Sequence, residues 1–533
     1  MTLATSQELR RSLAPYESYP LDGLLTRASQ RFGNKTAVID GDRRFTYRQV
    51  GAHSDRLAAA LAGMGVVKGD RVAILAPNCV EFVISFFGIL KAGAVVSTVN
   101  SGYREREIAH QLNDSGAETL IVHEALKPVA DLARDDVRGL KREIVISSDS
   151  SDSSSFWGLL ESAPDAPPNV TIDPMNDLAA LPYSSGTTGL SKGVMLTHYN
   201  LASNVRQFVS RKGEEASLTE NDVILTHLPL FHIYGMNVLM NGAIGTGATQ
   251  VMMGRFDMDE FLGLMSGHGV TVLFTVPPVG LGLTQYPAVR DTDLSALRVG
   301  FFGAAPLSED MQLRIQDALA TPIIQGYGMT EASPVTHADF MEPHLIKPGS
   351  IGPAMPDTDA KVVDVETGEN ELTSNEIGEL VVRGPQVMKG YYNNEAATAE
   401  TLTEDGWLHT GDIVRMDEDG YVWVLDRKKE LIKYKGFQVP PAELEGVLLE
   451  HPGISDAAVI GKEDLESGEI PKAFVVANPD VNLSADDVMS FVAGKVATFK
   501  HVREVEFMDA IPKNPSGKIL RRTLIERERE QGR

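Results

Sequence analysis

The stretch Tyr183-Ser-Ser-Gly-Thr-Thr-Gly-Leu-Ser-Lys-Gly-Val194 is the part of the chain that decides its fold and its chemistry. Its small residues let the backbone turn so that consecutive N–H groups point at one anion, and its hydroxyls and Lys192 supply further donors. This pattern indicates a phosphate-binding loop. On composition alone, a flexible surface turn is the alternative. A Walker A loop is excluded, because Ser191 rather than glycine precedes the lysine.

Composition places the chain among ordinary globular proteins. It has 533 residues, which is too many for one core, with 43% hydrophobic and 23% charged residues. The net charge of -24 argues against a nucleic-acid partner, whose binding depends on cationic side chains. Cys79 is the only cysteine, and no apolar run is long enough to span a membrane. We therefore expect a cytoplasmic protein without stable membrane insertion.

The order of predicted elements indicates an α/β fold. Strands at 71–76, 120–122 and 143–146 alternate with helices, and a second such series runs from 223 to 324. In the first series, Asn78 is predicted to cap the apolar helix that follows. Two doubly wound halves should therefore fill most of the first 340 residues, with ligands at the carboxyl ends of their strands. A small β-rich unit and then a small α+β unit should follow, with a capping box at Ser484-Ala-Asp-Asp487.

Three further motifs carry polar groups suited to a nucleotide. Gln325-Gly-Tyr-Gly-Met-Thr-Glu331 follows a predicted strand, and its glutamate could hold Mg²⁺. Asp412 could accept both hydroxyls of a ribose, and the loop Pro512 to Lys518 presents one lysine. Taken singly, each motif also fits a bland alternative, namely a capped turn or a solvated basic face.

In joint order and spacing, these motifs resemble the adenylate-forming superfamily of acyl-CoA synthetases, peptide-synthetase adenylation domains and beetle luciferases. The resemblance runs from about Tyr19 to Arg522 and is closest to 4-coumarate–CoA ligases and related acyl-CoA synthetases. It is carried by the segments 181–190, 325–332 and 430–439. Ser191 is a departure, since the family usually has proline there; activity is expected to survive it.

The resemblance implies a two-step reaction with ATP, Mg²⁺ and coenzyme A. Lys192 and the loop before it would hold the β- and γ-phosphates, Thr330 the α-phosphate, and Glu331 the metal ion. Tyr327 would stack on adenine, while Asp412 and Arg427 would bind ribose. The implied nucleotide-binding residues are Ser184, Ser185, Gly186, Thr187, Thr188, Gly189, Ala304, Ala305, Gln325, Gly326, Tyr327, Gly328, Asp412 and Arg427.

The resemblance also implies an acyl pocket with His232 at its entrance, although taken alone this histidine reads as a packed core residue. The pocket would be lined by His232, Tyr234, Val238, Phe301, Phe302, Gly303, Gly328, Pro334 and Val335. Adjacent aromatics on a strand point to opposite faces, so only one of Phe301 and Phe302 should line it. Plant coumarate ligases carry a lysine where Phe301 stands. We therefore expect an apolar acid, whether fatty, simple aryl or polycyclic.

The C-terminal region is implied to be a mobile domain at 427–533, following an N-terminal domain at 1–426. Lys429 matches the hinge. Lys518 would act in adenylation, and Lys433 in thioester formation, with Lys435, Gly436 and Phe437 facing CoA. The rival functions are an acyl-AMP ligase that loads a carrier protein, a 4-coumarate–CoA ligase proper, and an inactive nucleotide-binding relative. Acid identity and oligomeric state stay open.

Overall fold

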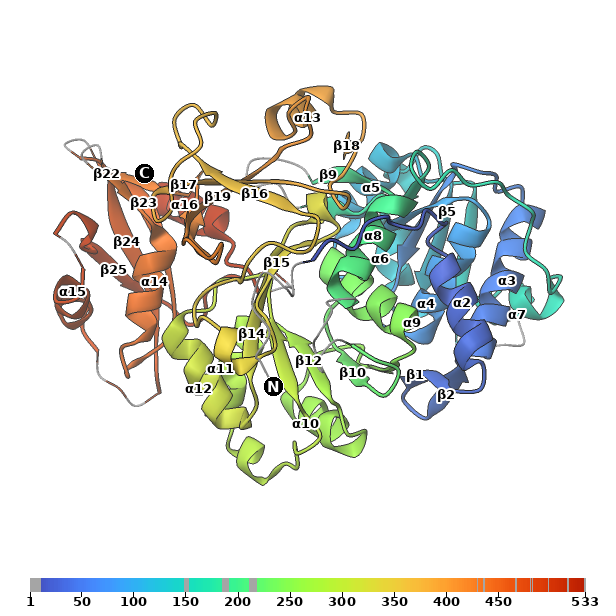
Figure 1. Cartoon of the computed structure of the whole chain (residues 1–533), viewed down its shortest axis with the longest axis horizontal. Helices are drawn as coiled ribbons and strands as arrows, with labels where there is room; N and C mark the ends of the chain where they lie inside the picture. Colours follow the sequence, from blue (N-terminus) through green and yellow to red (C-terminus); the bar gives the residue numbers. More distant parts are fainter. Residues whose placement is uncertain are drawn as a thin grey trace.

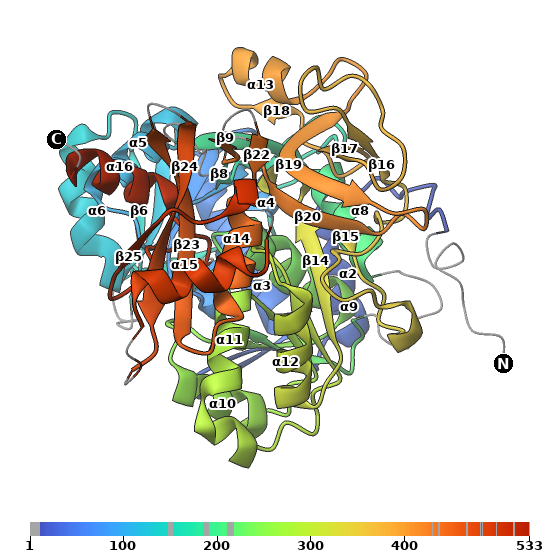
Figure 2. The ribbon, with the colours of Figure 1, turned by 90° about the vertical axis from the view of Figure 1, so that its left-hand side faces the viewer.

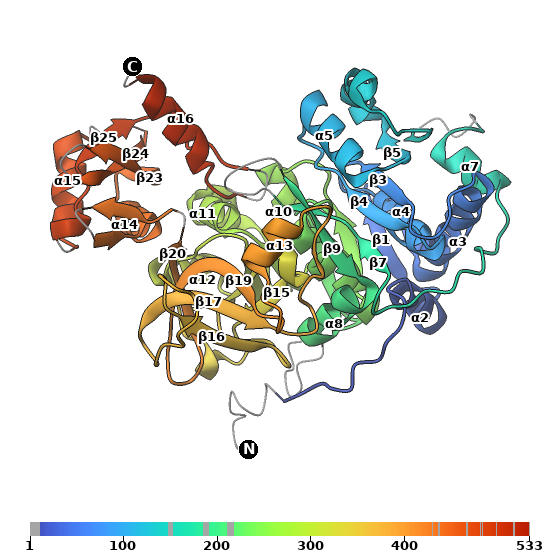
Figure 3. The ribbon, with the colours of Figure 1, turned by 90° about the horizontal axis from the view of Figure 1, so that it is seen from above.

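The computed structural model describes residues 11–147, 153–184, 191–209, 218–428, 430–434, 437–464, 467–479, 481, 483–496, 498–514 and 517–531. A large α/β domain occupies most of the molecule, and a small α+β domain near the C-terminus stands at one side of it (Figure 1). The predicted fold class is confirmed. Figure 2 turns this small domain toward the viewer, and from above it lies beside the larger one (Figure 3).

Sheet A is the core of the second α/β half, and its strand order is β15-β14-β13-β12-β10-β11-β1-β2. The strands from β14 to β1 run parallel, while β15 and β2 add antiparallel edges. Its strands are β1 (Thr36–Asp40), β2 (Arg43–Thr46), β10 (Val223–Thr226), β11 (Thr249–Met252), β12 (Val272–Thr275), β13 (Val299–Phe302), β14 (Ile323–Gly328) and β15 (Val335–Ala338). The helices of this half are α9 (Gly242–Thr246), α10 (Met258–Gly267), α11 (Pro277–Gln285) and α12 (Glu309–Leu319).

Sheet B is the core of the first half, with the order β18-β9-β7-β4-β3-β5-β6 and with β8 paired to β9. Its strands are β3 (Arg71–Leu75), β4 (Val95–Thr98), β5 (Thr119–His123), β6 (Arg142–Ile146), β7 (Leu178–Ala180), β8 (Tyr183–Ser184), β9 (Lys192–Thr197) and β18 (Gly390–Tyr391). Its helices are α2 (Gly23–Phe32), α3 (Tyr47–Gly63), α4 (Val80–Lys91), α5 (Glu105–Ser115), α6 (Lys127–Ala133), α7 (Phe156–Ser162) and α8 (His198–Val209). Every residue of α4 from Val80 to Leu90 is buried, as an all-round apolar helix requires.

One feature was not predicted from the sequence, and another was predicted wrongly. The hairpin of β1 and β2 precedes sheet B in the chain but joins sheet A, where Val38 and Ile39 pair with Gln250 and Val251 of β11. The predicted cap of α4 is wrong, because the helix begins after Cys79 without a side-chain cap. The Asn78 amide instead bonds to the backbone of the other half, where a long-range contact replaces the local one.

The remaining elements form two smaller sheets. Sheet C, of order β16-β17-β19-β20, closes the large domain. Sheet D, in which β22-β21-β24-β23 is extended by β25 on β24, belongs to the small domain. The strands are β16 (Asp359–Val363), β17 (Ile377–Arg383), β19 (Leu408–Met416), β20 (Val422–Arg427), β21 (Ile432–Tyr434), β22 (Phe437–Val439), β23 (Ile454–Asp464), β24 (Gly468–Ala477) and β25 (Glu504–Phe507). The helices are α13 (Glu395–Thr401), α14 (Pro441–Leu449), α15 (Ala485–Ala493) and α16 (Arg521–Gln531), and the predicted capping box opens α15.

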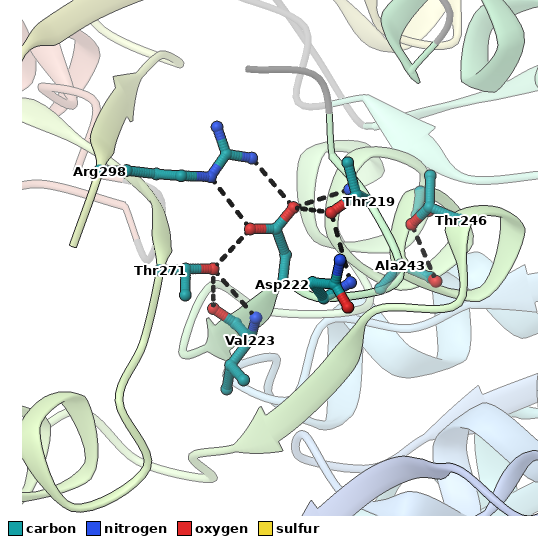
Figure 4. A network of polar contacts seen from close by, with 9 residues as sticks. Thr219, Asp222, Val223, Ala243, Thr246, Thr271 and Arg298 are labelled. Carbon is teal, nitrogen blue, oxygen red and sulfur yellow. Dashed lines mark hydrogen bonds and ion pairs between the residues drawn. The ribbon is translucent and has the colours of Figure 1, made fainter. Parts of the chain in front are cut away.

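A buried carboxylate ties together the amino ends of three neighbouring strands of sheet A (Figure 4). Asp222 precedes β10, and it accepts hydrogen bonds from the Thr271 hydroxyl at 2.7 Å and from the Arg298 guanidinium at 2.9 and 3.0 Å. It also accepts the Thr219 N–H at 2.7 Å. Thr271 and Arg298 directly precede β12 and β13. This network stabilises the edge of the sheet opposite its carboxyl ends.

Candidate active site

A cavity of about 1670 Å³ opens where the carboxyl ends of β12, β13 and β14 face sheet C and the small domain. This is the edge at which a doubly wound sheet is expected to bind ligands. The lining residues come from both halves of the large domain, from sheet C and from the segment around Lys518. One cavity therefore collects motifs that lie more than 300 residues apart in the chain.

The part of the cavity that is predicted to hold phosphate, called here the phosphate end, is built on the paired strands β8 and β9. Ser184 and Lys192 face each other across these strands, and both line the cavity. The Lys192 ammonium lies 4.8 Å from the ring centroid of Tyr391. The Tyr391 hydroxyl in turn donates to the Glu331 carboxylate at 2.8 Å. The predicted phosphate-binding residues Ser185, Gly186, Thr187, Thr188 and Gly189 lie outside the described residues.

Glu331 and Thr330 lie in the 3-10 turn η5 (Thr330–Ala332), directly after β14. Glu331 is 6% exposed, and both residues line the cavity. Burial, followed by the neighbouring charge of Glu331, raises the pKa of Tyr391 above its usual value. Tyr391 therefore stays a neutral donor that orients the carboxylate. Tyr391 was not predicted as a site residue, because it lies far from Glu331 in the sequence and nothing near it marks this contact.

Tyr327 and Arg427 line the end of the cavity that is predicted to hold the nucleoside, and both bond to the buried Asp412, which is outside the lining. Asp412 of β19 faces Arg427 of β20 in register, and the Arg427 Nε donates to its carboxylate at 2.8 Å. The Tyr327 hydroxyl donates to the other carboxylate oxygen. Burial and the adjacent carboxylate raise the pKa of Tyr327, and the charge of Asp412 raises that of Arg427. The three predicted nucleoside residues thus form one hydrogen-bonded unit.

Between these two ends of the cavity, glycines allow neighbouring backbone segments to lie close together. A Cβ on Gly328 would lie 2.0 Å from the Pro334 carbonyl oxygen, so the turn after β14 requires glycine. Gly303, Ala304, Gly326 and Gly328 line the cavity. Three of the described residues predicted to bind nucleotide do not. The Gln325 amide is buried and donates to Gln312, and both Ala305 and the buried Asp412 are outside the lining.

The part of the cavity that is predicted to hold the acyl group, called here the acyl end, is apolar and aromatic. Phe301 lies 5.1 Å from Phe274 between ring centroids, in a stacked arrangement, and 5.6 Å from Phe208. The predicted residues that line this end are His232, Tyr234, Val238, Phe301, Gly303, Gly328, Pro334 and Val335. Phe208 and Phe274 were missed, because nothing local in α8 or β12 marks them.

Phe302 does not reach the cavity, which resolves the alternative left open by the sequence. It is 1% exposed and packs in the core beneath β13, where a Cβ on Gly280 would meet its ring at 2.5 Å. Of the two aromatics, Phe301 is the lining residue. The predicted contact of Phe302 with substrate is therefore corrected.

His232 is one of the predicted acyl-pocket residues that line the cavity. Its Nδ1 accepts the Tyr234 N–H at 3.2 Å, which leaves Nε2 to carry the proton of the neutral ring. Burial lowers the pKa of His232 to about 4. The histidine is thus a neutral donor at physiological pH, and it lines the cavity instead of packing in the core.

The small domain contributes Lys518, which lines the cavity. Burial, with a further contribution from the charge of Arg427, lowers the pKa of Lys518. Gly517 packs against the large domain, since a Cβ there would lie 2.9 Å from the Pro278 side chain. Lys433 is exposed and outside the cavity lining, and the exposed Phe437 ring stacks on Phe499 at 4.7 Å. Lys429, Lys435 and Gly436 lie outside the described residues.

Within the described ranges, His, Cys, Asp and Glu side chains form no group of three that could hold a metal ion. The buried carboxylate of Glu331 suits Mg²⁺, which commonly uses one or two carboxylates with waters and substrate phosphates. In the same part of the chain, no helix has the length and apolar character needed to cross a bilayer.

Comparison with known proteins identifies the class. Residues 25–392 match the AMP-binding enzyme family, and residues 443–518 match the AMP-binding enzyme C-terminal domain. The chain is 42% identical over 518 residues to a 4-coumarate–CoA ligase of Pinus taeda, covering 95% of each.

Two solved structures share the fold over nearly the full length. ATP-bound MatB from Rhodopseudomonas palustris superposes with a TM-score of 0.87 at 30% identity, covering 96% of this chain and 100% of that one. The anthranilate CoA ligase AuaEII in complex with anthranoyl-AMP gives 0.89 at 28% identity, covering 96% and 97%.

The chain therefore belongs to the AMP-binding enzyme family. It is an adenylate-forming acid–thiol ligase of the CoA ligase type, and the predicted family and enzyme class are confirmed.

Proposed function

We propose that this ligase activates an apolar carboxylic acid, whether fatty, simple aryl or polycyclic, and transfers the acyl group to CoA. The observation that carries the choice of acid is the acyl end walled by Phe208, Phe274 and Phe301. A phenol or a charged tail would lose its hydration there without gaining a partner from these three rings. Affinity should instead grow with buried apolar surface, by about 25 cal/mol per Å².

In the first step, a carboxylate oxygen attacks the α-phosphorus of ATP, and pyrophosphate leaves. Lys192 and the loop before it hold the β- and γ-phosphates, and Thr330 binds the α-phosphate. Asp412 and Arg427 bind ribose, while Tyr327 lies against adenine. Glu331 would hold Mg²⁺, which neutralises phosphate charge when bound. His232 and Lys518 donate toward the oxygens on which charge develops. Support comes from the cavity, whose lining includes Lys192, His232, Tyr327, Thr330, Glu331, Arg427 and Lys518, and from the bond that joins Asp412 to Arg427.

In the second step, the CoA thiol attacks the acyl carbonyl and AMP leaves. Lys518 now lines the cavity and Lys433 does not, so this arrangement suits adenylation. For thioester formation, the C-terminal domain would rotate to bring Lys433, Lys435, Gly436 and the exposed Phe437 to the site. A carrier protein in place of CoA is the alternative acceptor.

The residues beside Lys429 support a hinge there. Lys428 is anchored to the large domain, because its ammonium bonds to Glu379 at 2.9 Å. Glu430 is anchored to the small domain, because Arg521 of α16 bonds to it at 2.9 Å. The side chains of Glu379, Glu430 and Arg521 are each at most 15% exposed. The boundary proposed at 426/427 accordingly falls within two residues of the pivot.

A panel of carboxylic acids tests the proposal. Each acid is scored first by acid-dependent ATP–pyrophosphate exchange and then by acyl-CoA formation. Cinnamate and medium-chain or alicyclic acids should have a higher kcat/KM than 4-coumarate. If 4-coumarate is the best substrate, the enzyme is a 4-coumarate–CoA ligase proper, the alternative that the similarity to the Pinus taeda enzyme favours. If adenylate forms but CoA is not acylated, the carrier-protein alternative holds. We expect the enzyme to be cytoplasmic.

A further inference from the structure

The segment 226–232 carries His232 from the end of β10 to the cavity. It leads into the π-helix η3 (Tyr234–Asn241), and it folds back sharply at its end. The His232 N–H bonds to the Pro229 carbonyl at 3.1 Å, and a Cβ on Gly235 would lie 2.2 Å from the same oxygen. The position of the His232 ring therefore depends on where this segment is held.

Asn78 of the other half of the domain holds the segment at three points. Its Nδ2 donates to the carbonyls of Thr226 and Leu228, both at 2.9 Å, and its Oδ1 accepts the Leu230 N–H at 2.8 Å. Asn78 is 7% exposed. It follows β3 of sheet B, yet it makes no cap for the helix that begins two residues later.

Thr98 adds a fourth contact from the same sheet. Its hydroxyl donates to the Phe231 carbonyl at 2.8 Å, and it is the last residue of β4. The carboxyl ends of two adjacent strands of sheet B thus grip a segment that belongs to sheet A. The contacts end one residue before His232.

We propose that Asn78 is a positioning residue for acid activation, and that it acts by fixing the segment that presents His232 to the acyl end of the cavity. The inference rests on the proposed role of His232. The amide uses both of its donors and its acceptor on residues 226, 228 and 230 of this one segment. Together these contacts define the path of the segment.

Asn78→Asp tests this with little change in volume. It removes both N–H donors and places a carboxylate against two carbonyl oxygens. The segment should shift, and a displacement of about 1 Å at a reacting group can cost on the order of 100-fold in rate. We expect acid-dependent ATP–pyrophosphate exchange with cinnamate to lose about 10- to 100-fold in kcat/KM for the acid. The KM for ATP should stay within about twofold, since the nucleotide end is built on other strands.

Asn200 is a matched control. It is 8% exposed, its Nδ2 donates to the carbonyls of Pro385 and Val387 at 2.8 and 2.9 Å, and its Oδ1 accepts the Thr197 N–H at 3.0 Å. Asn200→Asp should lower the Tm comparably. In a His232→Ala background, Asn78→Asp should lower kcat/KM for the acid by less than about threefold. Asn200→Asp should lower kcat/KM by the same factor whether His232 is present or replaced.

A second readout does not depend on activity. In the full chain labelled at histidine Cε1, NMR titration should find His232 with a pKa near 4 in the wild type. In Asn78→Asp, the ring should become more solvated and its pKa should rise toward the ordinary value of about 6.5. The His232→Ala variant assigns the signal. Thr98→Val, which removes one contact, should move the pKa in the same direction by less, and it replaces Asn78→Asp if that variant does not fold.

An unchanged pKa of His232 in Asn78→Asp or Thr98→Val overturns the inference. So does an Asn78→Asp loss of kcat/KM that is equally large with His232 present and in the His232→Ala background. Should the titration shift while His232→Ala keeps full activity, the segment is held as described but His232 has no role in the reaction. That result refutes the proposed function at this residue, and the positioning role with it.

Discussion

Replacing Lys518 by alanine should slow formation of acyl-AMP and spare conversion of supplied acyl-AMP to acyl-CoA. The reason is geometric, because Lys518 lines the cavity while Lys433 is exposed outside it. A unit charge about 4 Å from a developing phosphate charge is worth up to about 4 kcal/mol at an effective dielectric constant of about 20. Since Lys518 is half-buried and partly screened, we expect about 2.7–4 kcal/mol, or a 10²- to 10³-fold loss.

The two half-reactions separate in one assay series. Single-turnover formation of acyl-AMP measures the first, and thioester formation from purified acyl-AMP and CoA measures the second. Lys433→Ala is the matched control, and it should show the reverse pattern. If Lys518→Ala depresses both half-reactions equally, the division of labour between the two lysines is wrong.

The pH dependence gives an independent check on Lys518. Burial and the charge of Arg427 lower its pKa, so the charged form is present below that pKa and is lost as the pH rises through it. Adenylation should therefore fall on the alkaline side at a pH below the ordinary lysine value of about 10.4. The Lys518→Ala variant should lack this limb; an unchanged limb would assign it to another group.

Three further predictions follow from the same structure. Phe301 should make a ring hydroxyl costly, so cinnamate should exceed 4-coumarate by about 5- to 150-fold in kcat/KM, and Phe301→Lys should narrow or reverse that ratio. Lys429→Pro should abolish one half-reaction selectively, because it fixes φ at the proposed pivot; a variant with both steps intact would place the pivot elsewhere. Asp222→Ala should destabilise the fold by about 2–3 kcal/mol in urea unfolding, because it leaves Arg298 and Thr271 without their shared acceptor. Burial raises the pKa of Asp222, but hydrogen bonds from Arg298 and Thr271 outweigh it and lower that pKa. The carboxylate therefore stabilises the fold above about pH 3.9, and this stabilisation is lost as the pH falls through the pKa of the folded state. Equal free energies of unfolding for the wild type and Asp222→Ala at pH 7 would contradict this prediction.

Local patterns were enough for several helices and strands and for the family. The apolar stretch 82–90 predicted a buried helix, and the capping box at Ser484 predicted the start of α15; both are confirmed. The glycine turn after β14 and the lysine after the Ser/Thr loop likewise express short-range requirements, namely backbone space and a donor at fixed spacing. Such requirements are written within a few residues, so a sequence states them directly.

Contacts between distant segments were decided only by the tertiary structure. Asn78 stands where a helix cap is expected, but the segment 226–230 offers it three partners and draws its amide away. Phe301 and Phe302 are equivalent in the sequence, and the face of sheet A on which the cavity opens distinguishes them. Tyr391 reaches Glu331 across 60 residues. In each case the burial and hydrogen-bond free energy comes from a partner that the chain brings close only after its sheets have packed.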